Sequence, residues 1–481
     1  MSYYQNKGPT TESETAYKKI RISDSKWLAQ NEQVRLAIDI LNFALDAVNP
    51  ENLIKKSLKR KGFKLEIQAT LGRKIIDLEA FHQIFMVAIG KAAPLMAKAF
   101  LEILGDRVDK GIVVCYPRGD FSWPGIEKLE APHPFPDERS IMAAEKILAL
   151  KREVKERALI FFLISGGASA QIVKPIRPVT LNQKVELIKA LMQAGADIKE
   201  LNVVRKHLSE IKGGKLGKFF SPATIINIFI SDVVDDDLET IASAPTTWDN
   251  STFMDSKKII MKYKLWEKSP DSIKEIIEKG IQGEIEETRK IGEINHEKLL
   301  NFVVGNVEVA ARAASAIASQ MGFLPLILTL RERGEARNKA VLWASLIKNL
   351  SLSPQLKSNS YALISGGELT VTVKGQGKGG RNTEFCLALL KELIKEQISE
   401  DIRWCGASLA TDGHDGPTEA AGALIFPEII QEVISKCLDI KDYLESNDSL
   451  TFFEKIGSSI ITGPTGTNVM DLRLFLFQKN A

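Results

Sequence analysis

The chain has 481 residues, more than a single hydrophobic core usually organises, so two domains are expected. Its 64 lysines and arginines nearly balance its 61 aspartates and glutamates, which excludes the strongly basic surface typical of a nucleic-acid-binding protein. The four cysteines form no CxxC pair and no apolar run is long enough to span a bilayer, which argues against a disulfide framework, a structural zinc and a membrane protein. We therefore expect a cytoplasmic protein with reduced thiols.

Residues 1–25 are polar and show no periodicity, which predicts a flexible tail outside the folded core. A helical stretch follows at 32–47. From there to residue 255, short apolar runs such as FMVAI, LIFFLI and TIINIFI alternate with amphipathic stretches. This alternation predicts an N-terminal domain, residues 26–255, built as a parallel β-sheet covered by helices.

Residues 256–293 are charged and helix-prone and contain no strand pattern, which predicts a helical connection between two domains. A second α/β segment, residues 294–481, begins with NFVVGN. It contains YALISGGELTVTV, which we interpret as a tight hairpin, so this sheet should be mixed. The sequence Leu-Ile-Ser-Gly-Gly occurs in both halves, at 163–167 and 363–367. We interpret it as independent use of a favourable strand-to-turn sequence, which is simpler than an internal repeat.

Lys91 follows an apolar strand that ends at Gly90, and the next residues have the composition of an amphipathic helix. A cation at a helix N-terminus opposes the helix dipole by roughly 0.3–1 kcal/mol unless an anion lies between them. The glycine lets a ligand approach the backbone, and the amides of the first turn are expected to bind phosphate. Lys91 is therefore a candidate for phosphate binding, with a solvated surface lysine as the alternative.

Two glycine-rich turns are further candidates, because each can present backbone amides to phosphate. The first contains Ser165, Gly166, Gly167 and Ser169, and the second contains Gly213, Gly214 and Lys215. Alone, each pattern is also compatible with an ordinary turn or a helix C-cap. The chain has no GxxxxGK[ST] sequence, which excludes a P-loop ATPase.

An acidic cluster, Ser231 to Asp237, begins where the apolar strand TIINIFI ends. In an open α/β sheet this carboxyl edge is where ligands bind. Crowded carboxylates with few histidines nearby favour Mg²⁺ over zinc, and Mg²⁺ usually accompanies nucleotide phosphates. Asp232, nearest the strand end, is the predicted metal ligand, whereas Asp236 and Asp237 are as easily explained as caps of the next helix.

In the second half, the loop 374–382 connects LTVTV to an amphipathic helix and contains GxGxxG. LTVTV alternates polar and apolar residues, unlike the buried first strand of a dinucleotide fold, so a phosphate or carboxylate suits this cationic loop better. Arg381 offers a bidentate fork for such a group. Further along, Asp412 and Asp415 lie in a loop of small residues, where either is a candidate to bind metal or to accept a proton, whereas His414 is more simply a solvated loop residue.

Taken together, these motifs resemble the glycerate 2-kinase family, whose C-terminal part is the MOFRL domain, over residues 35–481. The blocks that carry the resemblance occur in the family's order: AIGKAA, HPFPDERS, ISGGASA, VVRKHLSEIKGGKL, SDVVDDDLETIASAPT, GEAR, ISGGELTVTVKGQGKGGRNTE, ATDGHDGPTEAAGA and TGPTGTNV. The resemblance implies an α/β protein of two domains, an N-terminal Rossmann-like doubly wound parallel sheet and a smaller C-terminal mixed α/β domain. It places the active site in the cleft between them.

The resemblance also implies a reaction, the transfer of a phosphoryl group from ATP to glycerate with Mg²⁺, giving 2-phosphoglycerate. The family's lysine falls on Lys91 and its arginine on Arg381, and these two residues, with Asp415 as a candidate general base, are the predicted catalytic residues. Asp232 or Asp412 would hold Mg²⁺. Besides the two glycine turns, the predicted nucleotide-binding or substrate-binding residues are Gly90, Glu368, Gly379, Gly380 and Asn382.

Four positions depart from the family pattern near predicted phosphate or metal sites: Ala168, Gln171, Asp235 and Ala244. An alanine in place of glycine is tolerated where φ is negative, and Asp235 adds a charge. Two alternative functions are an NAD(P)H-dependent hydroxypyruvate reductase and a catalytically silent nucleotide-binding regulatory protein. The sequence leaves open which hydroxyl is phosphorylated, which nucleotide and divalent cation are preferred, and whether the protein is a homodimer.

Overall fold

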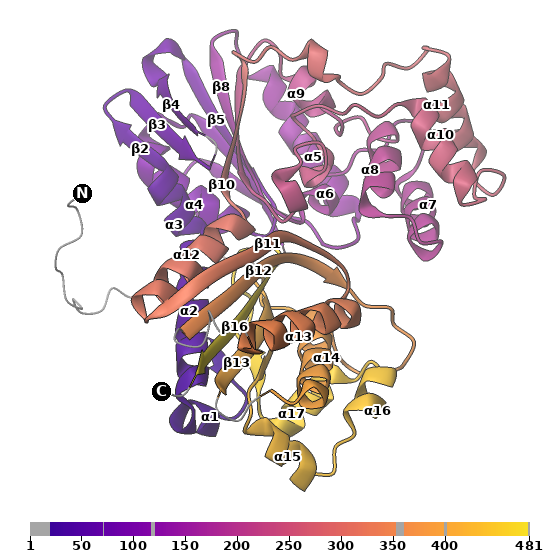
Figure 1. Ribbon diagram of the computed structural model, residues 1–481. Helices are drawn as coiled ribbons and strands as arrows, with labels where there is room; N and C mark the ends of the chain where they lie inside the picture. Colours follow the sequence, from indigo (N-terminus) through magenta and orange to yellow (C-terminus); the bar gives the residue numbers. More distant parts are fainter. Residues whose placement is uncertain (1–19, 71, 117–120, 353–359, 399–401, 480–481) are drawn as a thin grey trace.

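The computed structural model describes residues 20–70, 72–116, 121–352, 360–398 and 402–479. They form two lobes, one built on a six-stranded sheet and the other on a seven-stranded sheet (Figure 1). The prediction of a two-domain α/β protein is confirmed. Residues 1–19, most of the predicted tail, lie outside the described ranges. None of the helices in the described ranges is long and apolar enough to cross a membrane.

The sheet of the first lobe contains six parallel strands: β5 (Gln83–Ile89), β6 (Lys110–Cys115), β7 (Ile126–Glu130), β8 (Ala158–Ile164), β9 (Thr224–Ile230) and β10 (Leu299–Gly305). Their order is β10-β9-β8-β5-β6-β7, and every neighbouring pair is parallel. This is the strand order of a doubly wound Rossmann fold, in which the order reverses between β5 and β8. The predicted Rossmann-like parallel sheet is therefore confirmed.

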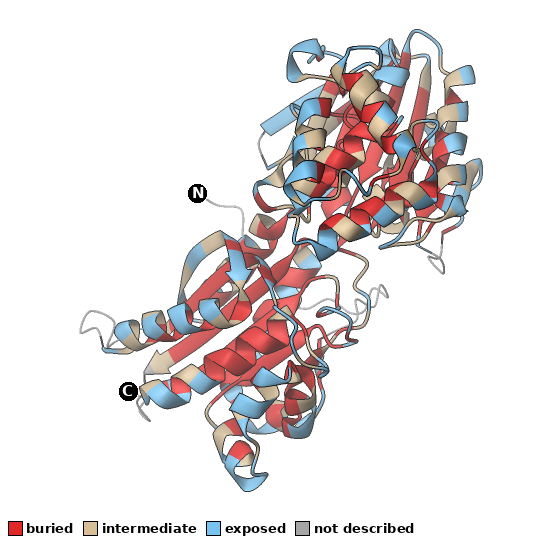
Figure 2. Ribbon diagram, turned by 90° about the vertical axis from the view of Figure 1, so that its right-hand side faces the viewer, coloured by how far each residue is buried: buried red, intermediate tan, exposed pale blue. Residues whose placement is uncertain are grey.

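Helices cover both faces of this sheet, which explains why its central strands are almost continuously apolar (Figure 2). Alternate side chains of β5 and β8 enter two separate cores. One core includes Phe100 of α4 (Ala93–Leu104), and the other includes Ile147 of α5 (Glu138–Ala149). A small antiparallel sheet precedes β5 and consists of β2 (Leu58–Lys61), β3 (Lys64–Ala69) and β4 (Gly72–Asp77), which follow α3 (Pro50–Ser57).

A group of helices extends the first lobe beyond the carboxyl ends of β8 and β9. It contains α6 (Ala168–Gln171), α7 (Leu181–Gln193), α8 (Ile198–His207), α9 (Lys215–Phe219), α10 (Phe253–Lys262) and α11 (Asp271–Ile281). Four of these, α7, α8, α10 and α11, share a core of their own. The segment 256–293 was predicted to connect the domains, but it folds back onto α8 because its apolar face needs a partner within this lobe.

The second lobe contains a mixed seven-stranded sheet with the order β1-β15-β14-β13-β16-β12-β11. Its strands are β1 (Arg21–Ile22), β11 (Phe323–Glu335), β12 (Ser360–Thr370), β13 (Ile402–Ala410), β14 (Gly422–Ile425), β15 (Ser459–Ile461) and β16 (Asp471–Lys479). Only β11 and β12 pair in parallel. Helices α2 (Glu32–Ala47) and α12 (Val307–Gln320) lie on one face, and α13 (Ala336–Leu352) and α14 (Arg381–Glu396) lie on the other (Figure 1).

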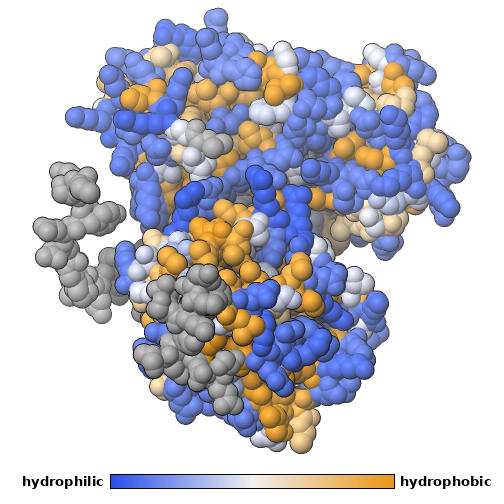
Figure 3. All heavy atoms as spheres, viewed as in Figure 1, coloured by the Kyte–Doolittle hydropathy of each residue, from blue (hydrophilic) through white to orange (hydrophobic). Residues whose placement is uncertain are grey.

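The remaining helices of the second lobe are α1 (Lys26–Gln30), α15 (Ile429–Ser435), α16 (Ile440–Glu445) and α17 (Ser449–Ile456). Strand β11 is the edge of the sheet, and Leu324, Ile327 and Leu328 are exposed on it. Figure 3 shows hydrophobic residues gathered on the visible face of this lobe, below a largely hydrophilic first lobe. A homodimer stays a prediction.

Two domain assignments and one predicted hairpin are wrong. Strand β10, expected to open the second domain, completes the first sheet beside β9. The predicted hairpin in YALISGGELTVTV is instead one continuous strand, β12, because both of its sides are paired, with β11 and with β16. Residues 20–47, assigned to the tail and to the first domain, pack on the second lobe through β1 and α2.

Candidate active site

The loops after β5 and β8 meet at the point where the strand order reverses. Gly90 has φ +121, and a Cβ there would collide with Ser165, so only glycine fits. The Lys91 amide donates to the Gly166 carbonyl over 2.8 Å, and the Ala92 amide donates to Ser165 Oγ over 3.0 Å. These contacts fix the backbone that carries Lys91, but they also occupy amides that were expected to bind phosphate.

Gln171, one of the departures from the family pattern, supports the same loop. It is fully buried, and its Oε1 accepts a hydrogen bond from the Gly90 amide over 2.8 Å. Gln171 therefore helps to position Lys91, although it departs from the family pattern.

The side chain of Lys91 crosses from the first lobe to the second. Its Nζ lies 3.0 Å from Oδ2 of Asp412, in the loop after β13. Lys91 keeps about a third of its side-chain surface accessible, 32%, and Asp412 keeps 16%. The two predicted residues are thus brought together as an ion pair between the lobes, and the lysine is not simply a solvated surface residue.

One carboxylate, Asp232, and one imidazole, His133, lie close to this ion pair. Asn468, in the loop before β16, donates to Asp232 Oδ2 over 3.2 Å, which ties the end of β9 to the second lobe. Burial raises the pKa of Asp232, and Asp412 raises it further, although Lys91 opposes both. His133 lies beside Lys91, and burial together with the charge of Lys91 lowers its pKa to about 4, so the ring is neutral at neutral pH.

Arg381 begins α14 and is held by carboxylates on two sides. Its Nε lies 2.7 Å from Asp471 Oδ2 and its Nη2 lies 3.3 Å from Glu368 Oε1. Burial opposes the charge of Arg381, but Asp471 and Glu368 outweigh burial and keep its pKa above the ordinary value. Asp471 also contacts Arg473, which contacts Glu332, so a buried row of alternating charges supports Arg381 from behind.

Glu368 lines the cleft on the second lobe, with 51% of its side chain accessible. Its pKa is raised to about 7, because the walls of the cleft displace part of the water around it and because Asp471, Asp232 and Asp412 repel its charge, while Arg381 acts in the opposite direction. A carboxyl group with a pKa near neutrality can exchange a proton at neutral pH.

Asp415 was predicted as a candidate base, but its contacts are those of a helix cap. Its Oδ1 accepts from the Asn382 amide and its Oδ2 accepts from the Thr383 amide, each over 2.8 Å, at the start of α14. The side chain is fully buried, and the Asn382 side chain also donates to it over 3.2 Å. Asp415 and Asn382 therefore hold the helix that presents Arg381, and neither side chain is free for a substrate.

The glycine turns make fewer amides available than the sequence suggested. The amides of Gly213 and Gly214 donate to the carbonyls of Ser243 and Ala244, over 3.1 and 2.6 Å. Lys215 points its ammonium group at the Ser209 carbonyl, 2.9 Å away. This turn therefore serves packing, and we correct the prediction that its amides bind a phosphate.

The GxGxxG loop is similarly engaged. The amides of Gly375 and Gly377 donate to Asn447 Oδ1 and the Ser446 carbonyl, each over 2.9 Å, and Gly379 packs against Ser449. The Gly380 amide donates to Thr383 Oγ1 over 3.0 Å. A dinucleotide would have to displace these partners, so this loop does not form a Rossmann phosphate turn.

The acidic residues beyond Asp232 have structural partners. Asp235 pairs with Arg331, Asp236 Oδ2 accepts from Asn306, and Asp237 accepts from the Glu239 amide. Asp237 thus closes a turn and is not the N-cap of the next helix, Ile241–Ser243, a position that Thr240 holds. In the described ranges, no group of three or more His, Cys, Asp or Glu side chains is arranged to hold a metal ion.

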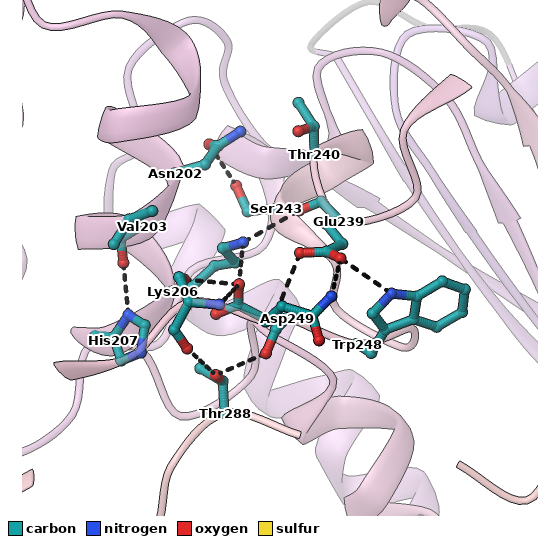
Figure 4. A network of polar contacts seen from close by, with 12 residues as sticks. Asn202, Val203, Lys206, His207, Glu239, Thr240, Ser243, Trp248, Asp249 and Thr288 are labelled. Carbon is teal, nitrogen blue, oxygen red and sulfur yellow. Dashed lines mark hydrogen bonds and ion pairs between the residues drawn. The ribbon is translucent and has the colours of Figure 1, made fainter. Parts of the chain in front are cut away.

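A polar network fixes the segment that follows this acidic cluster (Figure 4). Lys206 of α8 forms a buried ion pair of 2.5 Å with Asp249, and its ammonium also donates to the Glu239 carbonyl. Burial opposes the charge of Asp249, but Lys206 outweighs burial and lowers its pKa. In the same network Ser243 donates to Asn202 Oδ1 over 3.1 Å. The segment 239–249 is therefore held against α8.

A cavity of about 450 Å³ continues from the cleft into the first lobe. Of the predicted residues, Gly166, Gly167, Ser169, Asp232 and Glu368 line it. Sequence reasoning gave no role to His133, Lys184, Asn202, Arg205, Lys212 and Ser243, which also line it. The motif HPFPDERS contains His133 and the motif VVRKHLSEIKGGKL contains Arg205 and Lys212, whereas Lys184 follows the ordinary amphipathic pattern of α7 and gave no signal.

Comparisons with known proteins agree with this architecture. Residues 36–278 match a family described as a domain of unknown function, DUF4147, and residues 361–471 match the MOFRL family. A D-glycerate 2-kinase from Thermotoga maritima is 36% identical over 91% of this chain and 97% of its own length. A glycerate 2-kinase from Pyrococcus horikoshii is 34% identical over 90% of this chain and 95% of its own.

A solved structure of a glycerate kinase from Thermotoga maritima superposes with a TM-score of 0.79 at 35% identity, covering 92% of this chain and 99% of that one. A protein from Agrobacterium vitis with a provisional name, hydroxypyruvate reductase, is 40% identical over 81% of this chain and 86% of its own length. The Rossmann-order sheet, the cationic and carboxylate groups of the cleft and these relatives together define a two-domain α/β kinase without a P-loop. The chain belongs to the glycerate kinase family.

Two of the four departures, Asp235 and Ala244, fall on left-handed backbone. Their φ values are +72 and +52, whereas Ala168 begins α6 and is not left-handed. Ala244 ends a run of three consecutive left-handed residues that starts at Ala242. A Cβ makes this conformation unfavourable by roughly 1–2 kcal/mol.

We expect Ala244→Gly to raise the free energy of unfolding by about 1 kcal/mol, because glycine removes this strain and its larger backbone entropy in the unfolded chain offsets only part of the gain. Urea denaturation monitors the change. Ala168→Gly is the matched control and should destabilise by up to about 1 kcal/mol, since glycine is a poor helix residue. Equal destabilisation by both substitutions would contradict the account of strain at Ala244.

Proposed function

We propose that this protein transfers the γ-phosphoryl group of ATP to the 2-hydroxyl group of glycerate in the cleft between its lobes. The observation that supports this most directly is the approach of Lys91 and Arg381, from different lobes, to one group of carboxylates at the reversal point of the Rossmann sheet. Ligands of open α/β sheets bind at this point. ATP as co-substrate follows from membership of a kinase family.

Lys91 and Arg381 supply the positive charge that phosphoryl transfer requires. In this proposal the lysine leaves Asp412 for the transferring phosphoryl group, and the arginine, held in place by Asp471, offers its remaining N–H groups to the carboxylate of glycerate or to the same phosphoryl group. Such positioned charges lower the barrier by orienting the reactants and by neutralising the equatorial oxygens. Closure of the lobes would keep water out.

Asp232 and Asp412 are the side chains proposed to hold Mg²⁺. Mg²⁺ usually takes only one or two protein carboxylates and completes its shell with water and phosphate oxygens, so the absence of a three-residue cluster among the described residues is compatible with it. The raised pKa of Asp232 and its repulsion by Asp412 indicate a pair of carboxylates that would gain from a cation. When bound, Mg²⁺ would neutralise charge on the nucleotide phosphates.

Glu368 is the proposed proton acceptor for the hydroxyl of glycerate, in place of Asp415. Its carboxyl group faces the cleft beside Arg381 and has a pKa of about 7, whereas both oxygens of Asp415 are occupied at the start of α14. A base works best when its pKa lies near the working pH. We also propose that the enzyme acts in the cytoplasm, where ATP is available, and a homodimer remains a further proposal.

The reductase alternative is not favoured, although one relative carries that name. It was suggested by the GxGxxG loop, whose amides already donate to residues 446–447 and Thr383. A silent nucleotide-binding protein would not need two cations, one from each lobe, held at the cleft by carboxylates.

Product formation tests the proposed reaction directly. Incubation with ATP, Mg²⁺ and glycerate, coupled to enolase, should give immediate absorbance from 2-phosphoglycerate without an added mutase. Lys91→Met and Arg381→Met should each lower kcat by about 100-fold or more, because each removes charge from the transferring group. Lys98→Met is a control on the exposed side of α4 and should leave kcat unchanged. A product that needs a mutase, or NADH oxidation with hydroxypyruvate and no ADP release, would contradict the proposal.

The role of Glu368 predicts a pH dependence. Because the carboxylate is the active form and its pKa is about 7, kcat should rise as the pH increases from 6 to 8 and then level off. In Glu368→Gln that rise should disappear, with kcat lowered by about 10²-fold to 10⁴-fold.

Asp415→Asn provides the contrast for this pH profile. It should lower the melting temperature, since it weakens the cap of α14, but it should leave the midpoint of the pH profile near 7. A Glu368→Gln enzyme that keeps the same midpoint would show that another group accepts the proton.

A further inference from the structure

The cavity of about 450 Å³ runs from the catalytic cleft into the first lobe, away from Lys91 and Arg381. Asp232 and Glu368 also belong to the catalytic cleft, through contacts with Asn468 and Arg381, and they define the inner end of the cavity. Its walls are the segment 133–136, helices α7 and α8, and the segment 240–243 after β9. It therefore opens at the carboxyl edge of the Rossmann sheet, where nucleotides bind in this architecture.

Three cations, Lys184, Arg205 and Lys212, line this cavity without carboxylate partners. Lys184 and Lys212 are 6% and 3% exposed, and their ammonium groups donate only to backbone carbonyls: Lys184 to those of Arg205 and Leu208 at 2.9 Å each, and Lys212 to that of Ala242 at 3.0 Å. Arg205 donates to Asn202 Oδ1 over 3.3 Å. Within the described ranges, no carboxylate lies within ion-pair distance of any of the three.

The positive charges of these side chains repel one another, which lowers the pKa of the two lysines. Burial lowers the pKa of Lys184 strongly, and the charges of Lys212, Lys215 and Arg205 lower it further. Burial and Arg205 lower the pKa of Lys212 to about 7. A buried cation is costly unless it is paired. The natural partner for such a group is an anion that enters the cavity from outside the chain.

The mouth of the cavity has a different character. Phe135, Met192 and Ile198 line it and are exposed, at 49%, 48% and 56%. Leu181 and Ile188 continue this apolar wall inward. The ammonium of Lys189 lies 4.7 Å from the centre of the Phe135 ring, so this ring already takes part in a cation–π contact. An exposed apolar patch of this kind marks a binding surface.

We propose that this cavity is the nucleotide site, with the base of ATP on the apolar mouth formed by Phe135, Met192 and Ile198, and the α- and β-phosphates on Lys212 and Arg205. The γ-phosphate would then point at the inner end, toward Lys91 and Arg381. This assignment rests on the proposed kinase function and specifies which part of the cleft takes which substrate.

The dimensions and chemistry of the cavity favour the nucleotide over glycerate. Pockets for drug-sized ligands usually measure about 300–1,000 Å³, and they combine apolar walls with a few placed polar groups. Glycerate has three carbons, each bearing oxygen, and gains nothing from an apolar mouth. Asn202, Ser243 and Ser169, between the mouth and the inner end, supply polar groups for a ribose or a phosphate. Glycerate is then left with the cleft beside Arg381 and Glu368.

The assignment separates two contributions, one from the phosphates and one from the base, and equilibrium binding can measure each. Calorimetric titration with ADP and with inorganic tripolyphosphate, both with Mg²⁺, gives the two affinities without any turnover of glycerate. Lys212→Met should weaken both ligands by at least about tenfold, because it removes a charge-assisted contact to phosphate. Lys212→Arg, which keeps the charge, should retain most of the affinity, and the melting temperature of each variant reports on folding.

The double substitution Phe135→Ser and Ile198→Ser should weaken ADP by at least about tenfold and leave tripolyphosphate within about twofold, since it removes apolar surface alone. Both side chains are half exposed, so the fold should tolerate the change. The matched controls are Lys218→Met, an exposed lysine of α9 outside the cavity, and Ile434→Ser, an exposed isoleucine of α15, and neither should change binding.

Unchanged ADP affinity in both the Lys212→Met and the double variant would overturn the assignment, because the nucleotide must then bind elsewhere. Loss of both ligands in Lys212→Met with no effect of the double variant would overturn the placement of the base and leave only an anion site. Binding as expected without phosphorylation of glycerate would instead refute the proposed function and support the nucleotide site.

Discussion

The cleft holds more negative than positive charge, and the polar contacts that cross it depend on how that charge is paired. Four carboxylates, those of Asp232, Asp412, Glu368 and Asp471, lie around two cations, Lys91 and Arg381. Lys91 pairs with Asp412 of the opposite lobe, and Asn468 of the second lobe donates to Asp232 of the first, so both of these polar contacts join the lobes. A phosphoryl group would compete with Asp412 for the lysine and leave that carboxylate for a cation. In the proposed reaction, this exchange would favour a nucleotide that arrives with a metal ion over a free anion.

The strand order of the first lobe is that of a Rossmann fold, but its anion recognition differs from the usual glycine turn. In that turn, backbone amides at a helix N-terminus face the pyrophosphate. Here the corresponding amides donate to Gln171, Gly166 and Ser165, which lock the β5 and β8 loops together. Positive charge is supplied by side chains instead: by Lys91 and Arg381 in the cleft, and by the buried cations of the adjoining cavity.

The sequence predicted the central strands β5, β8 and β9 because each is a continuous apolar run, and the family motifs assigned Lys91, Arg381, Asp232 and Asp412 to one cleft. It failed where partners distant in the sequence decide the outcome. YALISGGELTVTV resembles a hairpin until β11 and β16 pair with both of its sides. From the sequence Asp415 is a candidate base, but in the structure its carboxylate accepts from the Asn382 amide at the start of α14.

The cavity was missed for a related reason. Lys184, Arg205 and Lys212 lie on or just after amphipathic helices, where a basic residue is normally a solvated one, and nothing local shows that α7 and α8 turn these residues inward. Similarly, Ala244 resembles an acceptable replacement of glycine until its φ is known.

The central claim is that one phosphoryl group lies between a lysine of the first lobe and an arginine of the second. A crystal structure with ADP, glycerate, Mg²⁺ and aluminium fluoride, which imitates the transferring phosphoryl group, tests it most directly. We predict a planar fluoride complex in contact with Lys91 and near Arg381, with the adenine at Phe135. Density for the nucleotide on the loop 375–380, or a fluoride complex that touches neither Lys91 nor Arg381, would contradict the account.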